Sequence, residues 1–222
     1  MKTTRQQMSR ILCALMALVC MFSMFSCGIF GNDEGEDKSG VAAISEIINN
    51  AKPTRVITHV SYTLDGETLK GRYTTQYDRA NNKGKFDFSY ERRAVPGESM
   101  SLNSIETIEG TVYSNNGEFS YDECATWQGG GVGYLEYSLD ITESKLATYE
   151  VSEDGNSLTA TVAKENAKRV FGVDISSQGD INLSVVTSGA DLYNVTISYT
   201  TTTGASVVIE TSYESLIINL DF

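Results

Sequence analysis

The residue types that most often carry out chemistry are sparse in this 222-residue chain. His59 is the single histidine, and cysteines stand only at positions 13, 20, 27 and 124. A zinc site takes several Cys or His ligands at short spacing, so we expect no metal site. Cys124 and His59 could act as a nucleophilic pair only if folding brought them together. Asp122 and Glu123 would raise the pKa of the adjacent Cys124 thiol, which argues against such a pair. His59 falls on the more polar face of its strand, which predicts a solvated position.

Pairs of carboxylates occur at Asp122–Glu123 and Glu153–Asp154. A glycosidase needs two carboxylates that face the same sugar, whereas adjacent residues on a strand point to opposite faces. The chain carries 29 acidic against 17 basic residues, so such pairs arise readily on a solvated surface. No G-x-S-x-G segment marks a serine hydrolase. We therefore expect no catalytic residues, no cofactor and no enzyme activity.

A glycine cluster at 128–133 (QGGGVG) follows Trp127, the single tryptophan. A phosphate-binding loop would continue with Lys-Ser/Thr or open a helix directly after a strand. The next residues, 134–137 (YLEY), do neither, which indicates a plain loop. Trp127 and the Gly129–Gly133 loop could gate a cavity, or Trp127 could plug one end of the core. Both interpretations stay open.

Aromatic residues are the remaining candidates for binding. Tyr62, Tyr73, Phe86 and Phe88 fall on the apolar sides of their strands and could belong either to the core or to the lining of a ligand site. The formal net charge of −12 argues against nucleic acid as a partner, because the protein would repel phosphate. Membership of the core is the default interpretation, because strands favour aromatic residues in any case, and the lining of a ligand site is the alternative.

The elements that must position these residues are mostly strands. From residue 54 onward apolar and polar residues alternate, with Val56, Val60 and Tyr62 on one side of the first segment. A period of two predicts strands with one buried and one wetter face. Asp65-Gly66 and Asn116-Gly117 separate such segments and tolerate the positive φ of tight hairpin turns. An antiparallel sheet follows from this pattern.

Two segments predict short helices. Ile44 and Ile48 recur at helical spacing after Ser39, a candidate cap, and Pro53 prevents a long continuation. Segment 163–171 (AKENAKRVF) ends before Gly172, which suits a left-handed C-terminal cap. The last residues, 216–222 (LIINLDF), predict either a final edge strand or a segment docked on the sheet.

The N-terminal residues have the pattern of an export signal. Residues 1–10 carry three basic residues and no acid, and residues 11–26 are almost wholly apolar. The apolar run is shorter than the roughly 20 residues that a membrane-spanning helix needs. Ser26 is a small residue directly before Cys27, which places a cleavage site between them.

Segment 24–28 (MFSCG) resembles the lipobox of bacterial lipoproteins. In that family the cysteine becomes the first residue of the mature chain and carries palmitate-type acyl chains, so the resemblance implies lipidation of Cys27. Several acyl chains would anchor the protein firmly, at about 0.8 kcal/mol per buried methylene. The implied location is the outer face of the bacterial cell membrane, facing the periplasm in a cell with two membranes. With Cys27 acylated and residues 1–26 removed, Cys124 would be left without a disulfide partner.

These boundaries divide the chain into three parts. Residues 1–26 form the lipoprotein signal peptide, 27–40 the lipidated cysteine and its tether, and 41–222 a single β-rich domain. The tether segment 31–40 (GNDEGEDKSG) has four acids and no apolar side chain, so it cannot bury surface and should extend. The mature chain would hold 14 basic and 29 acidic residues, a net charge of −15.

The predicted fold is mainly β, in the α+β class. It has a single, strongly curved antiparallel sheet or unclosed half-barrel, one N-terminal helix and one inserted short helix. This order of elements resembles the LolA/LppX-type lipoproteins, whose half-barrel carries helices across its concave side. The resemblance implies an apolar cavity that holds a lipid. Other one-domain antiparallel folds, including sandwiches, fit the strand pattern nearly as well. We expect a non-catalytic envelope lipoprotein that binds or carries a lipid; the alternative is a structural or protein-interaction domain without a cavity.

Overall fold

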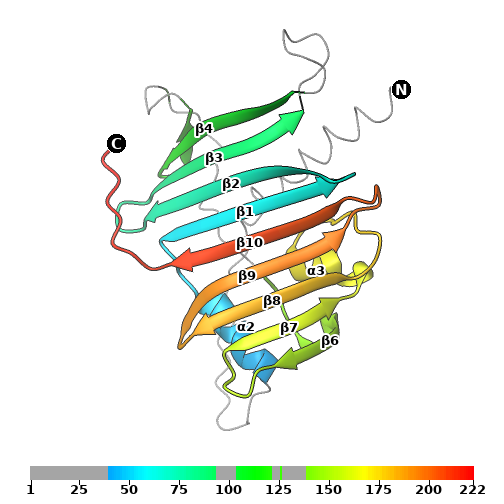
Figure 1. The fold of residues 1–222 in the computed structure, drawn as a ribbon. Coiled ribbons are helices and arrows are strands. Elements are labelled where there is room, and N and C mark those ends of the chain that lie inside the picture. The colour runs from blue at the N-terminus through cyan, green and yellow to red at the C-terminus, as the bar shows by residue number, and fades with distance from the viewer. Residues whose placement is uncertain (1–39, 94–103, 122–125, 127–138) are drawn as a thin grey trace.

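The computed structural model describes residues 40–93, 104–121, 126 and 139–222, and its dominant feature is one antiparallel sheet (Figure 1). The strands are β1 (Arg55–Leu64), β2 (Glu67–Asp78), β3 (Lys83–Arg93), β4 (Ile105–Asn115), β5 (Glu118–Ser120), β6 (Leu146–Val151), β7 (Ser157–Val162), β8 (Ile181–Ser188), β9 (Asp191–Thr200) and β10 (Ser206–Glu214). They are arranged in the order β5-β4-β3-β2-β1-β10-β9-β8-β7-β6. The two end strands do not pair with each other, so the sheet is open. This confirms the predicted mainly-β fold.

The sheet consists of two meanders joined by one long-range pairing. Strands β1 to β5 form one run of neighbours and β6 to β10 form the other. They meet where β1 pairs with β10, for example at Val60 and Ile209. Tight turns hold each meander, as predicted: Asp65 and Gly66 between β1 and β2 have φ angles of 53° and 81°. Such angles favour glycine and suit the hairpin turns that match the twist of the strands.

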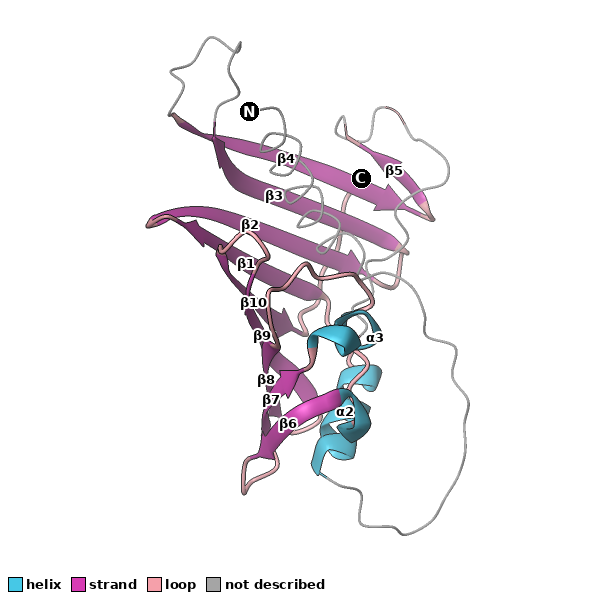
Figure 2. Ribbon diagram, turned by 90° about the vertical axis from the view of Figure 1, so that its right-hand side faces the viewer, coloured by secondary structure: helices cyan, strands magenta, loops and turns pink. Residues whose placement is uncertain are grey.

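Both described α-helices pack on one face of the sheet, over β6 to β9 (Figure 2). Helix α2 (Gly40–Asn50) buries Val41, Ile44 and Ile48 and contacts β7 and β9. Helix α3 (Ala167–Phe171) follows a 3-10 turn, η2 (Lys164–Asn166), and is shorter than the predicted span 163–171. Another 3-10 turn, η1 (Glu143–Lys145), precedes β6. In the described ranges, no helix is long and apolar enough to cross a bilayer.

Gly172 ends α3 as expected, with a left-handed φ of 71°. Its N–H donates to the carbonyl oxygen of Lys168 at 3.0 Å, which satisfies one of the carbonyls that a helix end leaves open. The same turn directs Val173 and Ile175 back into the core. The inserted helix is therefore short because its cap and the apolar residues after it turn the chain back toward the sheet.

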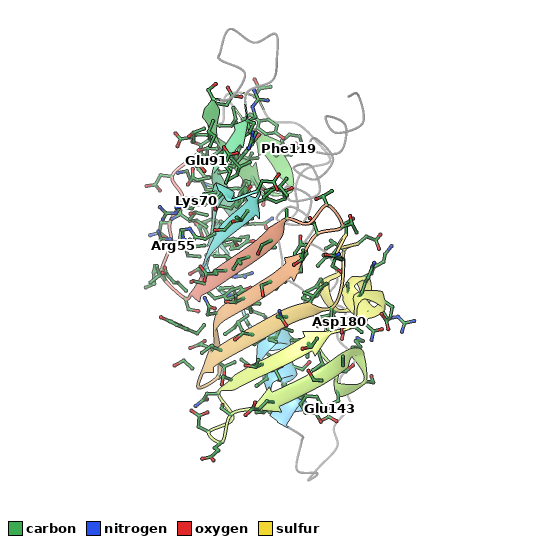
Figure 3. The ribbon with its side chains drawn as sticks, turned by 45° about the vertical axis from the view of Figure 1, so that its right-hand side comes forward. Arg55, Lys70, Glu91, Phe119, Glu143 and Asp180 are labelled. Carbon is green, nitrogen blue, oxygen red and sulfur yellow. The ribbon has the colours of Figure 1, made fainter. Side chains whose placement is uncertain are left out.

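The sheet has an inner face, which packs against the helices, and an opposite outer face. Core residues alternate along the strands on the inner face, as in Leu183 and Val185 of β8 and Val195 and Ile197 of β9. The outer face is polar; Arg55, Lys70 and Glu91 project from it (Figure 3). The predicted division into one buried and one wetter face is thus present, and the period-two pattern is its cause.

The C-terminal residues 216–222 follow β10 as a docked segment and not as an additional strand. Thr54 binds the backbone of Leu216, and Asp78 accepts a hydrogen bond from the N–H of Leu220 at 3.2 Å. Lys83 donates to the carbonyl oxygen of Leu220 at 3.0 Å. Phe222 packs edge-on against Tyr113 of β4 at 5.1 Å between ring centroids. The segment therefore crosses the ends of β1 to β4, which decides between the two alternatives predicted for it.

Candidate functional site

The four aromatic residues singled out in the sequence lie on the inner face of neighbouring strands. Tyr62 is on β1, Tyr73 on β2, and Phe86 and Phe88 on β3. In the register of the sheet, Tyr73 stands opposite Phe88, and Phe88 stands opposite Gly110 of β4. The period-two alternation directs all four side chains to the face that also carries the core. Folding therefore brings these candidates together.

Burial separates the four residues into two pairs. Tyr62 and Tyr73 are 9% and 6% exposed and belong to the main core cluster. Phe86 and Phe88 pack against that cluster but remain only partly buried. Tyr90, the next inner-face residue on β3, is also partly buried. Phe86, Phe88 and Tyr90 are therefore the aromatic side chains through which this face could contact a ligand.

The rings of Tyr73, Phe86, Phe88 and Tyr90 form a continuous row that we call the aromatic strip. Successive ring centroids are 6.1 Å apart from Tyr73 to Phe86, 6.0 Å from Phe86 to Phe88 and 6.2 Å from Phe88 to Tyr90. The angles between neighbouring ring planes are 14°, 34° and 29°. Offset rings at such distances attract one another weakly.

The aromatic strip lies on the half of the sheet that the described helices leave uncovered. Both α2 and α3 lie over β6 to β9, and neither lies over β2 to β4 (Figure 2). Large apolar side chains in a close-packed interior are usually fully buried. Three adjacent rings that remain partly exposed on the inner face are consistent with a surface that takes up an apolar molecule.

Charged residues mark one end of the aromatic strip. Arg92 follows Tyr90 on the inner side of β3 and forms an ion pair through its Nε atom with Glu106 of β4. Their side chains are 32% and 16% exposed. The inner face therefore changes from apolar to charged within two residues of Tyr90, a polarity that matches an amphiphile.

Tyr199 of β9 marks the boundary between the strip and the helix-covered half. Burial, and secondarily the nearby phenol of Tyr62, raise its pKa to about 12. The register places Tyr199 opposite Val207 of β10, which in turn stands opposite Tyr62. The two phenols thus carry the polar side-chain atoms of this inner-face row, between β9 and β1. The Tyr199 phenol remains protonated at neutral pH and can only donate or accept hydrogen bonds.

The other described candidates have structural roles. His59 is exposed on the outer face of β1, opposite Glu210 and Arg72, in agreement with the predicted solvated strand position. Asp154 lies in the turn between β6 and β7, where its carboxylate accepts hydrogen bonds from Ser152 and Asn156. These bonds, the one from Ser152 foremost, lower the pKa of Asp154. No cluster of three metal-ligating side chains occurs in the described part of the chain.

Several predicted positions lie outside the described residues. They are Ser26 and Cys27 of the proposed cleavage and lipidation site, the acids Asp122 and Glu123, Cys124, Trp127 and the Gly129–Gly133 loop. The gate interpretation of Trp127 and the nucleophilic pairing of Cys124 with His59 therefore remain predictions. The boundaries 1–26, 27–40 and 41–222 also remain predictions.

Two residues of the site were missed as candidates in the sequence. Tyr90 continues the alternation of Phe86 and Phe88, so extending the period by one step would have included it. Gly110 gives a weaker signal, because a glycine inside a predicted strand indicates only a bulge or a close approach. Here a Cβ atom at Gly110 would lie 2.4 Å from the Cζ atom of Phe88. The group that approaches Gly110 closely is the ring of Phe88.

Comparisons with known proteins give little beyond these observations. No protein-family model matches the chain, and no curated protein matches it. Among solved structures, the chain is similar to a DUF1329 family protein from Desulfovibrio piger, with 9% sequence identity and a TM-score of 0.27. The similarity covers 82% of this chain and 94% of the other. At that TM-score it carries no argument about fold or function. What the described residues define is an open antiparallel sheet, half covered by helices, with an aromatic strip on its uncovered half.

Proposed function

We propose that this protein is a membrane-anchored lipoprotein of the bacterial cell envelope that binds or carries a lipid on its aromatic strip, without catalysis. The observation that carries the proposal is the partial exposure of Phe86, Phe88 and Tyr90 on the core side of an open sheet. Burying apolar surface against such a row is favourable by roughly 25 cal/mol for each Å² removed from water. The charged pair at the end of the strip suits the polar end of a lipid.

The lipid-binding proposal is tested by measuring ligands directly. Protein purified from cells is extracted with organic solvent and analysed by mass spectrometry, and the delipidated protein is titrated with a fluorescent fatty acid. Phe86→Ala removes one ring from the strip, and we expect about tenfold weaker binding, the equivalent of about 1.4 kcal/mol. Tyr193→Ala is the matched control, because Tyr193 is 61% exposed on β9, outside the strip; it should change the affinity less than twofold, well under one kcal/mol.

The result that would overturn lipid binding is specific. If wild-type protein carries no lipid after purification and binds no fatty acid, the strip has another purpose. Equal loss of binding in Phe86→Ala and Tyr193→Ala would also contradict the proposal, because only Phe86 belongs to the strip. Thermal unfolding of both variants shows whether each is folded at the assay temperature.

The membrane anchor is a separate part of the proposal and rests on the lipobox resemblance of 24–28 (MFSCG). Cys27→Ala should abolish metabolic labelling with palmitate and leave the precursor unprocessed, because the thiol is the acylated group. Ser23→Ala is the control, since it alters the leader without touching the cleavage site. Labelling that persists in Cys27→Ala would contradict the anchor and leave lipid binding by the strip unaffected.

The alternative is a protein-interaction domain, and one feature favours it. Strand β6 is an end strand with four of its six residues exposed. Unpaired backbone groups on such an edge can accept a strand from another chain. The register shift between Leu146 and Thr148 interrupts the ladder near one end of β6 and weakens this candidate. Protein that elutes as a lipid-free complex with another chain would favour it over lipid binding.

A further inference from the structure

The rings of the aromatic strip do not all stand upright on the sheet. A Cβ atom built at Gly110 would lie 2.4 Å from Cζ of Phe88 and 2.9 Å from its Cε1 atom. Phe88 and Gly110 are direct partners across β3 and β4, where Cβ atoms normally stand about 4.5–5.5 Å apart. The Cζ end of the Phe88 ring is therefore closer to the Cβ position of Gly110 than the Cβ atom of Phe88 would normally be. The Phe88 ring leans across the sheet and rests over the glycine.

The ring of Tyr73 lies over Gly71 in a similar way. A Cβ atom at Gly71 would lie 3.0 Å from Cε2 of Tyr73 and 3.1 Å from its hydroxyl oxygen. Gly71 is two residues before Tyr73 on the same strand, so the phenol folds back along β2 over the glycine. Residues two apart on a strand point to the same face. The Tyr73 ring can therefore lie over position 71 because glycine has no side chain there. Two inner-face glycines thus allow two rings of the aromatic strip to lean over toward the sheet.

We infer that Gly110 is a specificity-determining residue, which flattens the aromatic strip so that the strip selects an unbranched acyl chain lying lengthwise along β3. This inference rests on the proposed lipid-binding function. Between Phe86 and Tyr90 the strip extends about 13 Å along the strand, at about 3.3 Å for each residue. A straight chain touches such a surface along its whole length, whereas methyl branches hold the chain away from it. Dispersion contacts weaken steeply when a gap opens.

The orientation of the ligand follows from the ends of the strip. Toward residue 92 the inner face becomes charged, with Arg92 paired to Glu106. Toward residue 84 it carries Gly84 and Ser114, which are small and uncharged. The polar head of the amphiphile therefore lies at the Arg92–Glu106 end. The shared chemistry is an unbranched acyl chain with a polar head, either a free fatty acid or a lysophospholipid.

The chain offers a matched pair of glycine substitutions. Gly84 is also on the inner face of β3, but a Cβ atom there would meet its nearest neighbours, the Gln76 carbonyl oxygen and the Ser114 Cβ atom, only at 3.7 Å. Gly84→Ala therefore fits without displacing a ring, whereas Gly110→Ala must lift Phe88. Phe88→Leu is a second variant that removes the ring without any clash, in case Gly110→Ala folds poorly.

The test titrates each protein with hexadecanoic acid, with its tetramethyl-branched counterpart phytanic acid and with palmitoyl-lysophosphatidylglycerol, by displacement of a fluorescent fatty acid. Wild type should prefer the straight acid over the branched one by about tenfold, equivalent to about 1.4 kcal/mol. Gly110→Ala and Phe88→Leu should lose most of that preference, and Gly84→Ala should keep it. The lysophospholipid arm shows which head group is preferred.

Each outcome bears on the inference. Equal affinity of wild type for the straight and branched acids would overturn it while leaving lipid binding intact. Identical profiles for Gly110→Ala and Gly84→Ala would overturn the role of Gly110. If wild type binds none of the three probes, the proposed function itself is wrong. Thermal unfolding and far-ultraviolet circular dichroism verify that each variant is folded.

Discussion

Helix α2 helps to cover one half of the inner face. Truncating Ile44 tests whether the buried residues of α2 hold the helix there. Ile44 is fully buried against the core, whereas Ile47 on the same helix is only partly buried. Ile44→Ala removes three carbons, worth about 2.4 kcal/mol at about 0.8 kcal/mol for each buried methylene. The cavity left behind brings the expected loss of unfolding free energy to about 2–5 kcal/mol.

Ile47→Ala is the matched control, because it removes the same atoms from the same helix. We expect it to cost at least about 1 kcal/mol less, since part of the Ile47 side chain is already in water. Urea unfolding followed by circular dichroism measures both, with the slope against urea unchanged if the variants unfold in the same manner. Equal losses in the two variants, or a loss below about 1 kcal/mol for Ile44→Ala, would refute the packing of α2 through its buried residues.

The two further predictions concern groups whose titration is shifted by folding. The side-chain amide of Asn81 foremost, and the N–H groups of Leu220 and Asn81, lower the pKa of Asp78. Its stabilising contribution is therefore present above the ordinary Asp pKa of about 3.9 and is lost as the pH falls through the folded pKa. Asp78→Asn should flatten this acid limb in urea unfolding and reduce protection of the Leu220 amide from hydrogen exchange; an unchanged amide would contradict the docking of the C-terminal segment. For Tyr199, with a pKa of about 12, the contribution is fully present below about pH 10 and is lost as the pH rises through 12. Tyr199→Phe should remove that part of the alkaline dependence, and a wild-type-like alkaline limb in the variant would contradict the burial of this phenol.

The turns and strands were predictable because their causes are local. Asp65-Gly66 and Asn116-Gly117 adopt the positive φ angles that their residue types favour, and each lies between strands that alternate in polarity. The short helix before Gly172 was likewise predictable from its left-handed cap, although the α-helical part begins only at Ala167. Its first residues form a 3-10 turn, a difference that residue propensity does not reveal at a helix end.

The pairing of strands was less predictable because it depends on distant residues. Adjacent hairpins follow from short loops, but the pairing of β1 with β10 joins residues more than 140 positions apart, such as Val60 and Ile209. The same alternation that placed Val60 on a buried face would have fitted other neighbours. The partial burial of Phe86 and Phe88 likewise depends on where α2 packs, and nothing in the alternation of β3 indicates that.

By itself the sequence determined the type of each element, the polarity of each strand face and the residues that turn the chain, because these follow from local backbone preference and from side chains at spacing two. The tertiary structure decided which strands are neighbours and which half of the inner face the helices cover. It also decided that the ring of Phe88 lies over Gly110. These outcomes depend on packing between segments far apart in the chain, where the free energy belongs to the contact between residues and not to either residue alone.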